Sequence, residues 1–311
     1  MKKKLLLIYI FLAFLISSKS QQDAMFTYYM FNSQSINPAY VGSKDVINVT
    51  MLNRSQWTGF EGAPWSHTIS LSTPLINESL GFGLSFSNDV IGPSTLNNFT
   101  LDFAYHLKLN NPNHRLSMGV KVGGNHTRID LNSLELDNQN DPSFNVDNIG
   151  KFMPNFGFGF YYYTTKWYLG VSSPQLVNFD FNSSQRHYFV RAGAVFKITE
   201  NLKIRPSSFL KFTKNAASTL DLTGLLIFRD ETWAGFAFRA PVGIFVPTGS
   251  SGGGYAFLVG LNLSDQLSVG YSFGYSVGNQ TFKFNNGSHE ITLRYDHIYE
   301  SKKIIKSPRY F

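Results

Sequence analysis

Apolar side chains alternate with small or polar ones along most of this 311-residue chain. In residues 80–87 every second residue is Leu or Phe, and the residues between them are Gly or Ser. Residues 99–109 repeat the pattern, with Thr, Asp, Ala, His and Lys between the apolar positions. A repeat of two is that of a β-strand whose two faces meet different surroundings. The sequence therefore predicts an all-β protein.

About fourteen segments share this alternation. They are residues 47–57, 65–73, 80–87, 99–109, 116–123, 156–162, 167–171, 188–198, 202–212, 220–228, 234–238, 255–263, 267–275 and 289–295. Many are about 9 to 11 residues long, which suits a tilted strand that crosses a bilayer, whereas soluble strands average about 5 to 6. A soluble β-sandwich is the alternative that strand length argues against.

The connections also alternate in length. Short ones are residues 164–166, 199–201, 229–232 and 264–266, and long ones are 124–154, 172–186, 240–252 and 276–287. Short turns at one rim and long loops at the other are typical of outer-membrane barrels. Aromatic residues near strand ends predict interfacial girdles: Trp57, Trp65, Tyr105, Tyr163, Trp167, Trp233, Tyr275 and Tyr295. We expect a transmembrane antiparallel up-and-down β-barrel of about 14 strands with an N-terminal lead-in or plug segment.

The N-terminus has the pattern of a secretory signal. Three lysines precede the apolar run of residues 5–16, and Ser18-Lys19-Ser20 is a small-x-small cleavage site. We therefore expect a cleaved signal peptide at 1–20, a periplasmic lead-in or plug at 21–46, an outer-membrane barrel at 47–299 and a basic tail at 300–311. The even strand count and the short turns predict periplasmic termini.

Composition excludes several classes of function. Only 15% of residues are charged, 16% are aromatic, and there are 0 Cys, so neither disulfides nor a lipid-modified cysteine is available. The formal net charge of +7 falls to about +3 (7 − 4) once Lys2, Lys3, Lys4 and Lys19 leave with the signal. No dense basic stripe for nucleic acid is present. No catalytic or metal-binding motif has a suitable context, so we expect no enzyme, no cofactor and no metal.

The predicted inward face is rich in glycine: Gly81, Gly83, Gly119, Gly123, Gly157, Gly159, Gly270 and Gly274. Small inward side chains leave lumen space that something must fill or pass through. Charged positions also point inward: Asp102, Lys108, Lys121, Arg191, Lys197, Arg239 and Arg294. They are expected either to solvate a wet interior or to contact a polypeptide.

The segment that follows the signal differs from the strands. It is rich in aromatic residues and Met and ends in Ile36-Asn37-Pro38-Ala39-Tyr40. Pro38 disfavours a helical Asn37, so a short helix through residues 23–32 should end before it. Asn37, Pro38 and Tyr40 are expected either to fold this segment into the lumen as a plug or to leave it packed on the periplasmic rim.

These residues carry a family resemblance. Residues 25–32 (MFTYYMFN), 36–42 (INPAYVG), 54–57 (RSQW) and 62–64 (GAP) resemble the opening of the PorP/SprF proteins, outer-membrane components associated with the type IX secretion system of the Bacteroidota. The ending Lys306-Ser307-Pro308-Arg309-Tyr310-Phe311 is similar to that of many members. The resemblance makes Asn37, Pro38, Ala39, Tyr40 and Trp57 the family motif, and the C-terminal tail a second candidate site.

The resemblance implies a non-enzymatic partner barrel. Its expected partners are type IX secretion components, outer-membrane lipids and a large secreted cargo with a C-terminal sorting domain, such as a gliding adhesin, and no nucleic acid. The long loop at 124–154 is the chief candidate for cargo contact. Phe311 is expected to serve barrel insertion, or the basic tail to dock an acidic partner. The alternative function is an outer-membrane channel or a FadL-like transporter of small or hydrophobic solutes.

Overall fold

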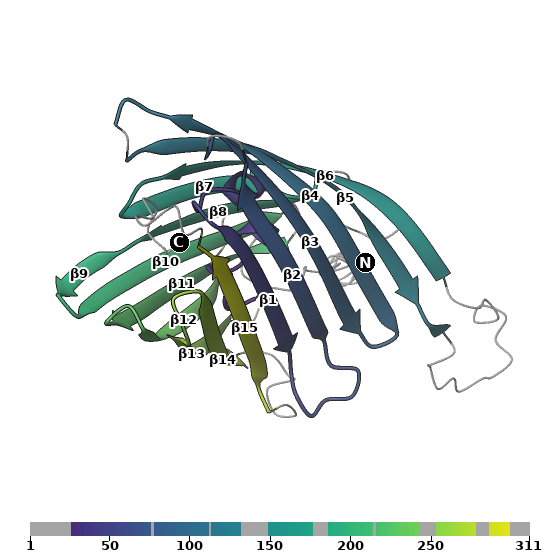
Figure 1. Cartoon of the computed structure of the whole chain (residues 1–311). Helices are drawn as coiled ribbons and strands as arrows, with labels where there is room; N and C mark the ends of the chain where they lie inside the picture. Colours follow the sequence, from purple (N-terminus) through teal and green to yellow (C-terminus); the bar gives the residue numbers. More distant parts are fainter. Residues whose placement is uncertain are drawn as a thin grey trace, which may run out of the picture.

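The computed structural model describes residues 26–75, 78–111, 113–131, 149–176, 186–213, 216–242, 253–277 and 286–298. In these ranges the chain forms one closed antiparallel barrel (Figure 1). Closure pairs the first wall strand with the last one, in the register Ile47 opposite His297 to Ser55 opposite His289. A closed wall leaves no open edge around the ring, as a barrel in hydrocarbon requires.

The elements follow one another around the ring in chain order (Figure 1). Inside it lie α2 (Ser33–Ile36) and the 3-10 turn η1 (Pro38–Tyr40). The strands are β1 (Ile47–Ser55), β2 (Trp65–Pro74), β3 (Leu80–Ile91), β4 (Ser94–Lys108), β5 (Arg115–Ile129), β6 (Ile149–Tyr163), β7 (Trp167–Ser173), β8 (His187–Ala194), β9 (Phe196–Thr199), β10 (Leu202–Thr213), β11 (Ala216–Phe228), β12 (Thr232–Val242), β13 (Gly253–Asn262), β14 (Leu267–Val277) and β15 (Ser288–His297).

Fifteen assigned strands make fourteen wall positions. β8 pairs with β10 from His187 opposite Thr213 to Gly193 opposite Ser207, and β9 pairs with the start of the same β10. Only Val195 separates the two strands. β9 therefore continues β8 past Trp167, the first residue of β7, and the prediction of about 14 strands is confirmed.

Two rims can be told apart by the connections. We call the rim where β1 begins and β15 ends the terminal rim, and the opposite one the loop rim. The connections at Thr164–Lys166 and after Thr199 lie at the terminal rim, as the short turns should. At the loop rim the strands reach further than expected, because residues 124–129 and 149–154 pair within β5 and β6. Residues 132–148 of the expected long loop lie outside the described residues.

The outer wall is apolar and the inner wall is polar. On β5, Met118, Val120 and Val122 are exposed on the outer face, while Ser117 and Lys121, which alternate with them, are buried. Trp65, Tyr105, Trp167 and Tyr295 are also exposed, near strand ends as a lipid interface requires. No helix in the described ranges is long and apolar enough to cross a bilayer.

Two of the expected girdle aromatics, Tyr163 and Trp233, lie inside the barrel, and for them that prediction is wrong. Tyr163 and Trp233 are only 7% and 8% exposed and belong to clusters inside the barrel. Trp57 lies in the loop after β1, where its backbone N–H donates a hydrogen bond to Ser288 Oγ at 3.3 Å. Position near a strand end does not reveal which face a residue occupies, because that depends on register.

Candidate functional site: the filled lumen

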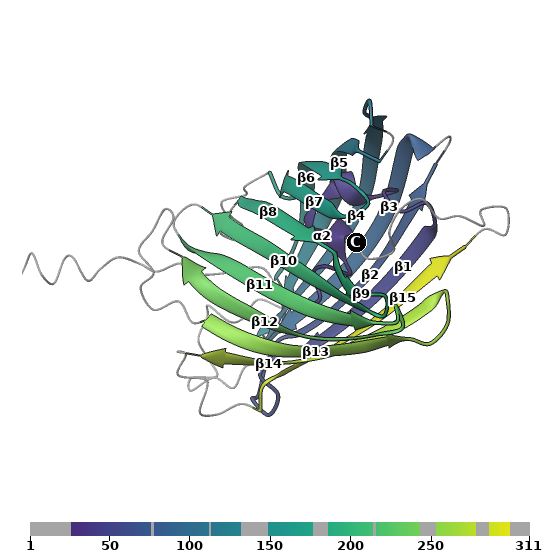
Figure 2. The same ribbon diagram turned by 90° about the vertical axis from the view of Figure 1, so that its left-hand side faces the viewer.

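Residues 26–46, here called the inner segment, lie inside the ring of strands (Figure 2). All of its residues from Tyr28 to Val46 except Ser35 are buried. Its helical turn is shorter and later than expected, at Ser33–Ile36 rather than through residues 23–32. The chain leaves the turn at Asn37, whose extended backbone precedes Pro38.

Asn37 connects the inner segment to itself and to the wall. Its Oδ1 accepts a hydrogen bond from the N–H of Ala39 at 2.9 Å and so caps η1. Its Nδ2 donates to the carbonyl of Phe160 in β6, also at 2.9 Å. One fully buried amide therefore fixes both the turn and its position against the wall.

The β3–β6 side of the lumen meets the inner segment at backbone distance. A Cβ added at Gly81 would overlap the carbonyl of Val41, one at Gly119 the backbone of Ala39, and one at Gly159 the side chain of Asn37. The inward glycines of β3, β5 and β6 thus do not leave open space at these points. They allow a second polypeptide to lie against the sheet.

Side chains of β4, β5 and β7 form hydrogen bonds with carbonyls of the inner segment. Ser117 Oγ donates to the carbonyl of Ala39 at 2.6 Å, and Ser172 Oγ to that of Ile36 at 2.9 Å. His106 Nε2 bonds the carbonyl of Val41 at 2.9 Å. Backbone groups that no strand pairs are in this way satisfied by the wall, as burial demands.

Tyr40 faces a buried arginine. The Arg191 guanidinium lies 6.0 Å from the ring centre of Tyr40 and 4.6 Å from that of Tyr168, within the range of cation–π contact. Burial raises the pKa of the Tyr40 hydroxyl to about 12, although nearby Arg191 opposes the shift. Tyr40 therefore stays neutral at physiological pH.

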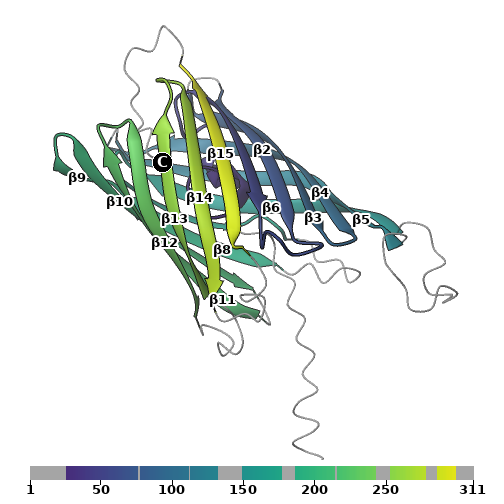
Figure 3. The same cartoon turned by 90° about the horizontal axis from the view of Figure 1, so that it is seen from below.

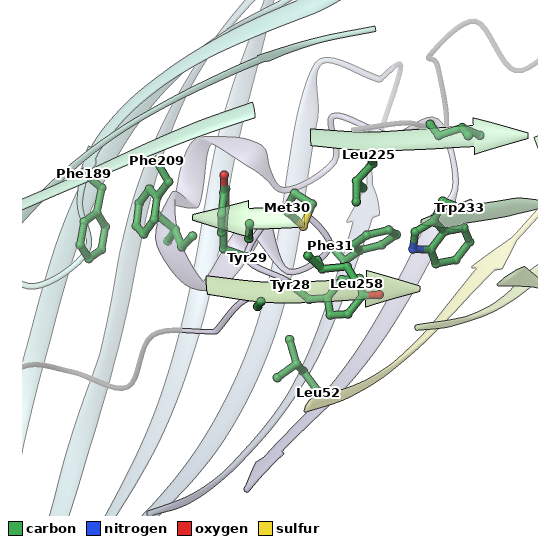
Figure 4. Close-up of a cluster of buried hydrophobic side chains, with 14 residues drawn as sticks. Tyr28, Tyr29, Met30, Phe31, Leu52, Phe189, Phe209, Leu225, Trp233 and Leu258 are labelled. Carbon is green, nitrogen blue, oxygen red and sulfur yellow. The ribbon is translucent and has the colours of Figure 1, made fainter. Parts of the chain in front are cut away.

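The β10–β15 side meets the inner segment through large side chains (Figure 4). Tyr29 stacks on Phe209 and Phe31 on Trp233, with ring centres 5.0 and 5.4 Å apart. The Tyr28 hydroxyl donates to the carbonyl of Val259 at 2.7 Å. Aromatic pairs of this kind add about 0.5–1.5 kcal/mol each beyond the area they bury.

Charged groups anchor both ends of the inner segment. At its start, Glu290 in β15 accepts hydrogen bonds from the N–H groups of Thr27 and Tyr28 at 2.8 and 2.6 Å. At its end, Lys44 lies 3.8 Å from Asp296, and Asp45 lies 3.9 Å from Arg115. The inner segment is thereby tied to the wall at two levels.

The predicted inward charges mostly pair with each other or touch the inner segment. Lys121 Nζ lies 2.8 Å from Asp102, whose second oxygen accepts from Gln34 Nε2 at 3.1 Å. Arg239 forms two 2.7 Å hydrogen bonds with Asp221. Arg294 lies 5.3 Å from the Phe31 ring. Lys108 and Lys197, by contrast, are exposed at the terminal rim.

The structure brings together only part of the predicted site. Asn37, Pro38, Ala39 and Tyr40 form one buried turn, whereas Trp57 lies at the loop rim. The signal at 1–20 and the tail residues Lys306, Ser307, Pro308, Arg309, Tyr310 and Phe311 lie outside the described residues. Glu290 and Arg54 lie next to each other across β1 and β15, and the sequence pattern does not predict them as site residues. Both occupy inward polar positions of an alternating strand, as many other residues of the inner wall do, so no local signal distinguishes them.

Within the described ranges no group of three or more His, Asp or Glu side chains is placed to hold a metal ion. The feature that the described residues do form is a barrel whose interior holds the buried inner segment.

Comparison with solved structures places the fold among outer-membrane barrels. The Acinetobacter baumannii outer membrane protein Omp33 superposes with a TM-score of 0.50 at 11% identity, covering 82% of this chain and 100% of its own. A Pseudomonas aeruginosa FadL homologue gives 0.46 at 13% identity, over 84% and 92%. The KdgM porin gives 0.39 at 11%, over 81% and 99%. The likeness to Omp33, at 11% identity, shows the fold alone.

No functionally curated protein matches the chain. A family profile does, over residues 18–295, which include the inner segment and nearly the whole wall. The chain therefore belongs to the family described as type IX secretion system membrane protein PorP/SprF.

Proposed function

We propose that this protein is a closed outer-membrane partner of the type IX secretion system that supports export, anchoring or surface display of a cargo protein. The cargo we have in mind is a secreted adhesin with a C-terminal sorting domain. The observation that carries the proposal is the filled lumen, since the inner segment lies against the glycines of β3–β6 and against the aromatic cluster of β10–β15. A wall lined in this way offers its outer surfaces, rather than a pore, for function.

The orientation follows from the same proposal. The terminal rim faces the periplasm, and the basic tail at 300–311 meets secretion components on that side. The loop rim faces outward, where secreted cargo would be held. Residues 124–129 of β5 and 149–154 of β6, which pair with each other, belong to this rim.

Deleting the gene tests the proposal. We expect the surface proteome to lose one large secreted protein, while uptake of small and hydrophobic solutes and the remaining secretome stay unchanged. Re-expression of the wild-type chain should restore that protein, and isotope-labelled surface proteomics would measure it. Loss of solute uptake with an intact surface proteome would contradict the proposal and favour the transporter alternative.

A further inference from the structure

β6 continues far beyond the neighbour on one of its sides. With β5 it pairs along its whole length, from Tyr163 opposite Arg115 to Ile149 opposite Ile129. With β7 it pairs only from Tyr163 to Phe158. Above that level, among the described residues, the N–H of Leu176 still bonds the carbonyl of Phe156 at 2.8 Å. From residue 155 to residue 149 no described strand pairs with this edge of β6.

The backbone groups on this edge can be identified. In an antiparallel ladder the N–H and C=O of one residue point to the same neighbour and those of the next residue to the other one. Because the carbonyl of Phe156 points toward the β7 side, those of Pro154, Phe152 and Gly150 do so too. Proline lacks an N–H, and within sheets it occurs at edges that make no ladder on that side. The edge therefore presents two donors and three acceptors that no strand among the described residues pairs.

This edge stands above the lipid-facing band. The outer face of β5 is apolar up to Val122, and then His126 and Arg128 are exposed. Residues 149–154 of β6 pair with the polar part of β5. β5 and β6 reach past the neighbouring strands at this end (Figure 1; Figure 3 shows the projection from below). An exposed edge of this kind in water is a template for a further strand.

An aromatic anchor lies on the same stretch. Phe152 is 66% exposed, the highest value among the large apolar side chains of the described residues. Its ring lies across Gly124, where a Cβ would collide with it. Backbone pairing gives affinity in strand addition, and a neighbouring apolar side chain gives selectivity. Arg128 adds a positive charge. It pairs with Gly150, which has no side chain that could cover this charge.

We propose that the edge of β6 from Gly150 to Pro154 is a strand-addition site for an extended segment of the cargo polypeptide. The segment pairs with Gly150 and Phe152, places an apolar side chain on the Phe152 ring and an acidic one toward Arg128. This inference rests on the proposed function, because it names the contact through which the barrel would hold its cargo.

Photo-crosslinking in cells tests the contact. A benzoylphenylalanine at position 152 should cross-link a secreted protein through a short segment, which mass spectrometry would locate. The control position is His126, on the same outer face but one strand away from the edge, and its yield should be about tenfold lower. Equal yields at the two positions, or cross-links only to residues 177–185 of the same chain, would overturn the inference.

A pair of variants separates the edge from the proposed function. Phe152→Ala removes the ring but keeps the N–H, whereas Phe152→Pro also removes the donor. We expect surface cargo to fall further in the proline variant, by roughly tenfold for one lost hydrogen bond of about 1.4 kcal/mol, with the barrel still folded. If gene deletion abolishes cargo display and Phe152→Pro does not, the inference fails and the function stands. If gene deletion leaves display intact, the proposed function fails as well.

Discussion

The two sides of the lumen hold the same peptide by different means. On the β3–β6 side, the wall backbone at Gly81 and Gly119 lies against the backbone of the inner segment, and at Gly159 it lies against the side chain of Asn37. On the β10–β15 side, rings such as Phe31 and Trp233 fill the distance. The first kind of contact has no adjustable part, while the second can repack by changing rotamers.

The difference predicts how each side tolerates change. An added methyl group on the glycine side has to move either the sheet or the inner segment, and both are fixed by hydrogen bonds. A smaller or differently shaped side chain on the aromatic side leaves a gap that neighbouring rings partly refill. The glycine side should therefore set the position of the inner segment, and the aromatic side should add stability.

Replacing Gly119 should have the largest effect. Gly119→Val would drive its side chain into the backbone of Pro38 and Ala39, and we expect the free energy of unfolding to fall by about 3 kcal/mol, the upper end for overpacking. Urea titration of the barrel in lipid vesicles would measure it. The matched control is Gly224→Val, since a Cβ at Gly224 meets nothing within 4 Å. If the two variants are equally stable, close backbone contact at Gly119 does not fix the position of the inner segment, and the predicted contrast between the two sides is wrong.

Asn37→Ala should have an intermediate effect. It removes the hydrogen bond to the Phe160 carbonyl and the cap on Ala39, leaving buried groups unpaired at a cost of about 2 kcal/mol. Asn37→Asp serves as the control because it keeps the capping oxygen and loses the donor. If thermal unfolding, followed by gel mobility of unheated samples, shows no change for either, then Asn37 does not fix the turn.

Phe31→Leu should have the smallest effect. The stack on Trp233 is lost, but leucine keeps most of the apolar volume, so the free energy of unfolding should fall by about 1 kcal/mol. The same urea titration measures it. A loss as large as that of Gly119→Val would mean that the aromatic side, too, is unable to adjust, and the contrast between the sides would disappear.

The sequence predicts the wall far better than the interior. Alternation in residues 99–109 or 116–123 depends on one face meeting lipid, and that constraint acts on every strand alike. It reveals the strand count, the inward glycines and the short turns of the terminal rim. It does not separate Trp233 from a girdle residue, because a tryptophan near a strand end suits both a lipid interface and an inner cluster.

The arrangement of the inner segment depends on contacts between residues far apart in the chain. Asn37 meets Phe160, and Tyr28 meets Glu290, pairings that no local pattern encodes. The sequence does indicate the turn itself through Asn37 and Pro38. The inward glycines predict lumen space that something must fill or pass through, but they do not predict that the wall backbone lies directly against residues 26–46.

Single-channel recording in a planar bilayer tests the central claim, that the inner segment closes the lumen, most directly. The purified wild-type barrel should show no conductance steps, while a variant that lacks residues 26–40 should conduct, because the filled path is then open. Steady wild-type conductance as large as that of the deletion variant would contradict the claim and support a channel instead.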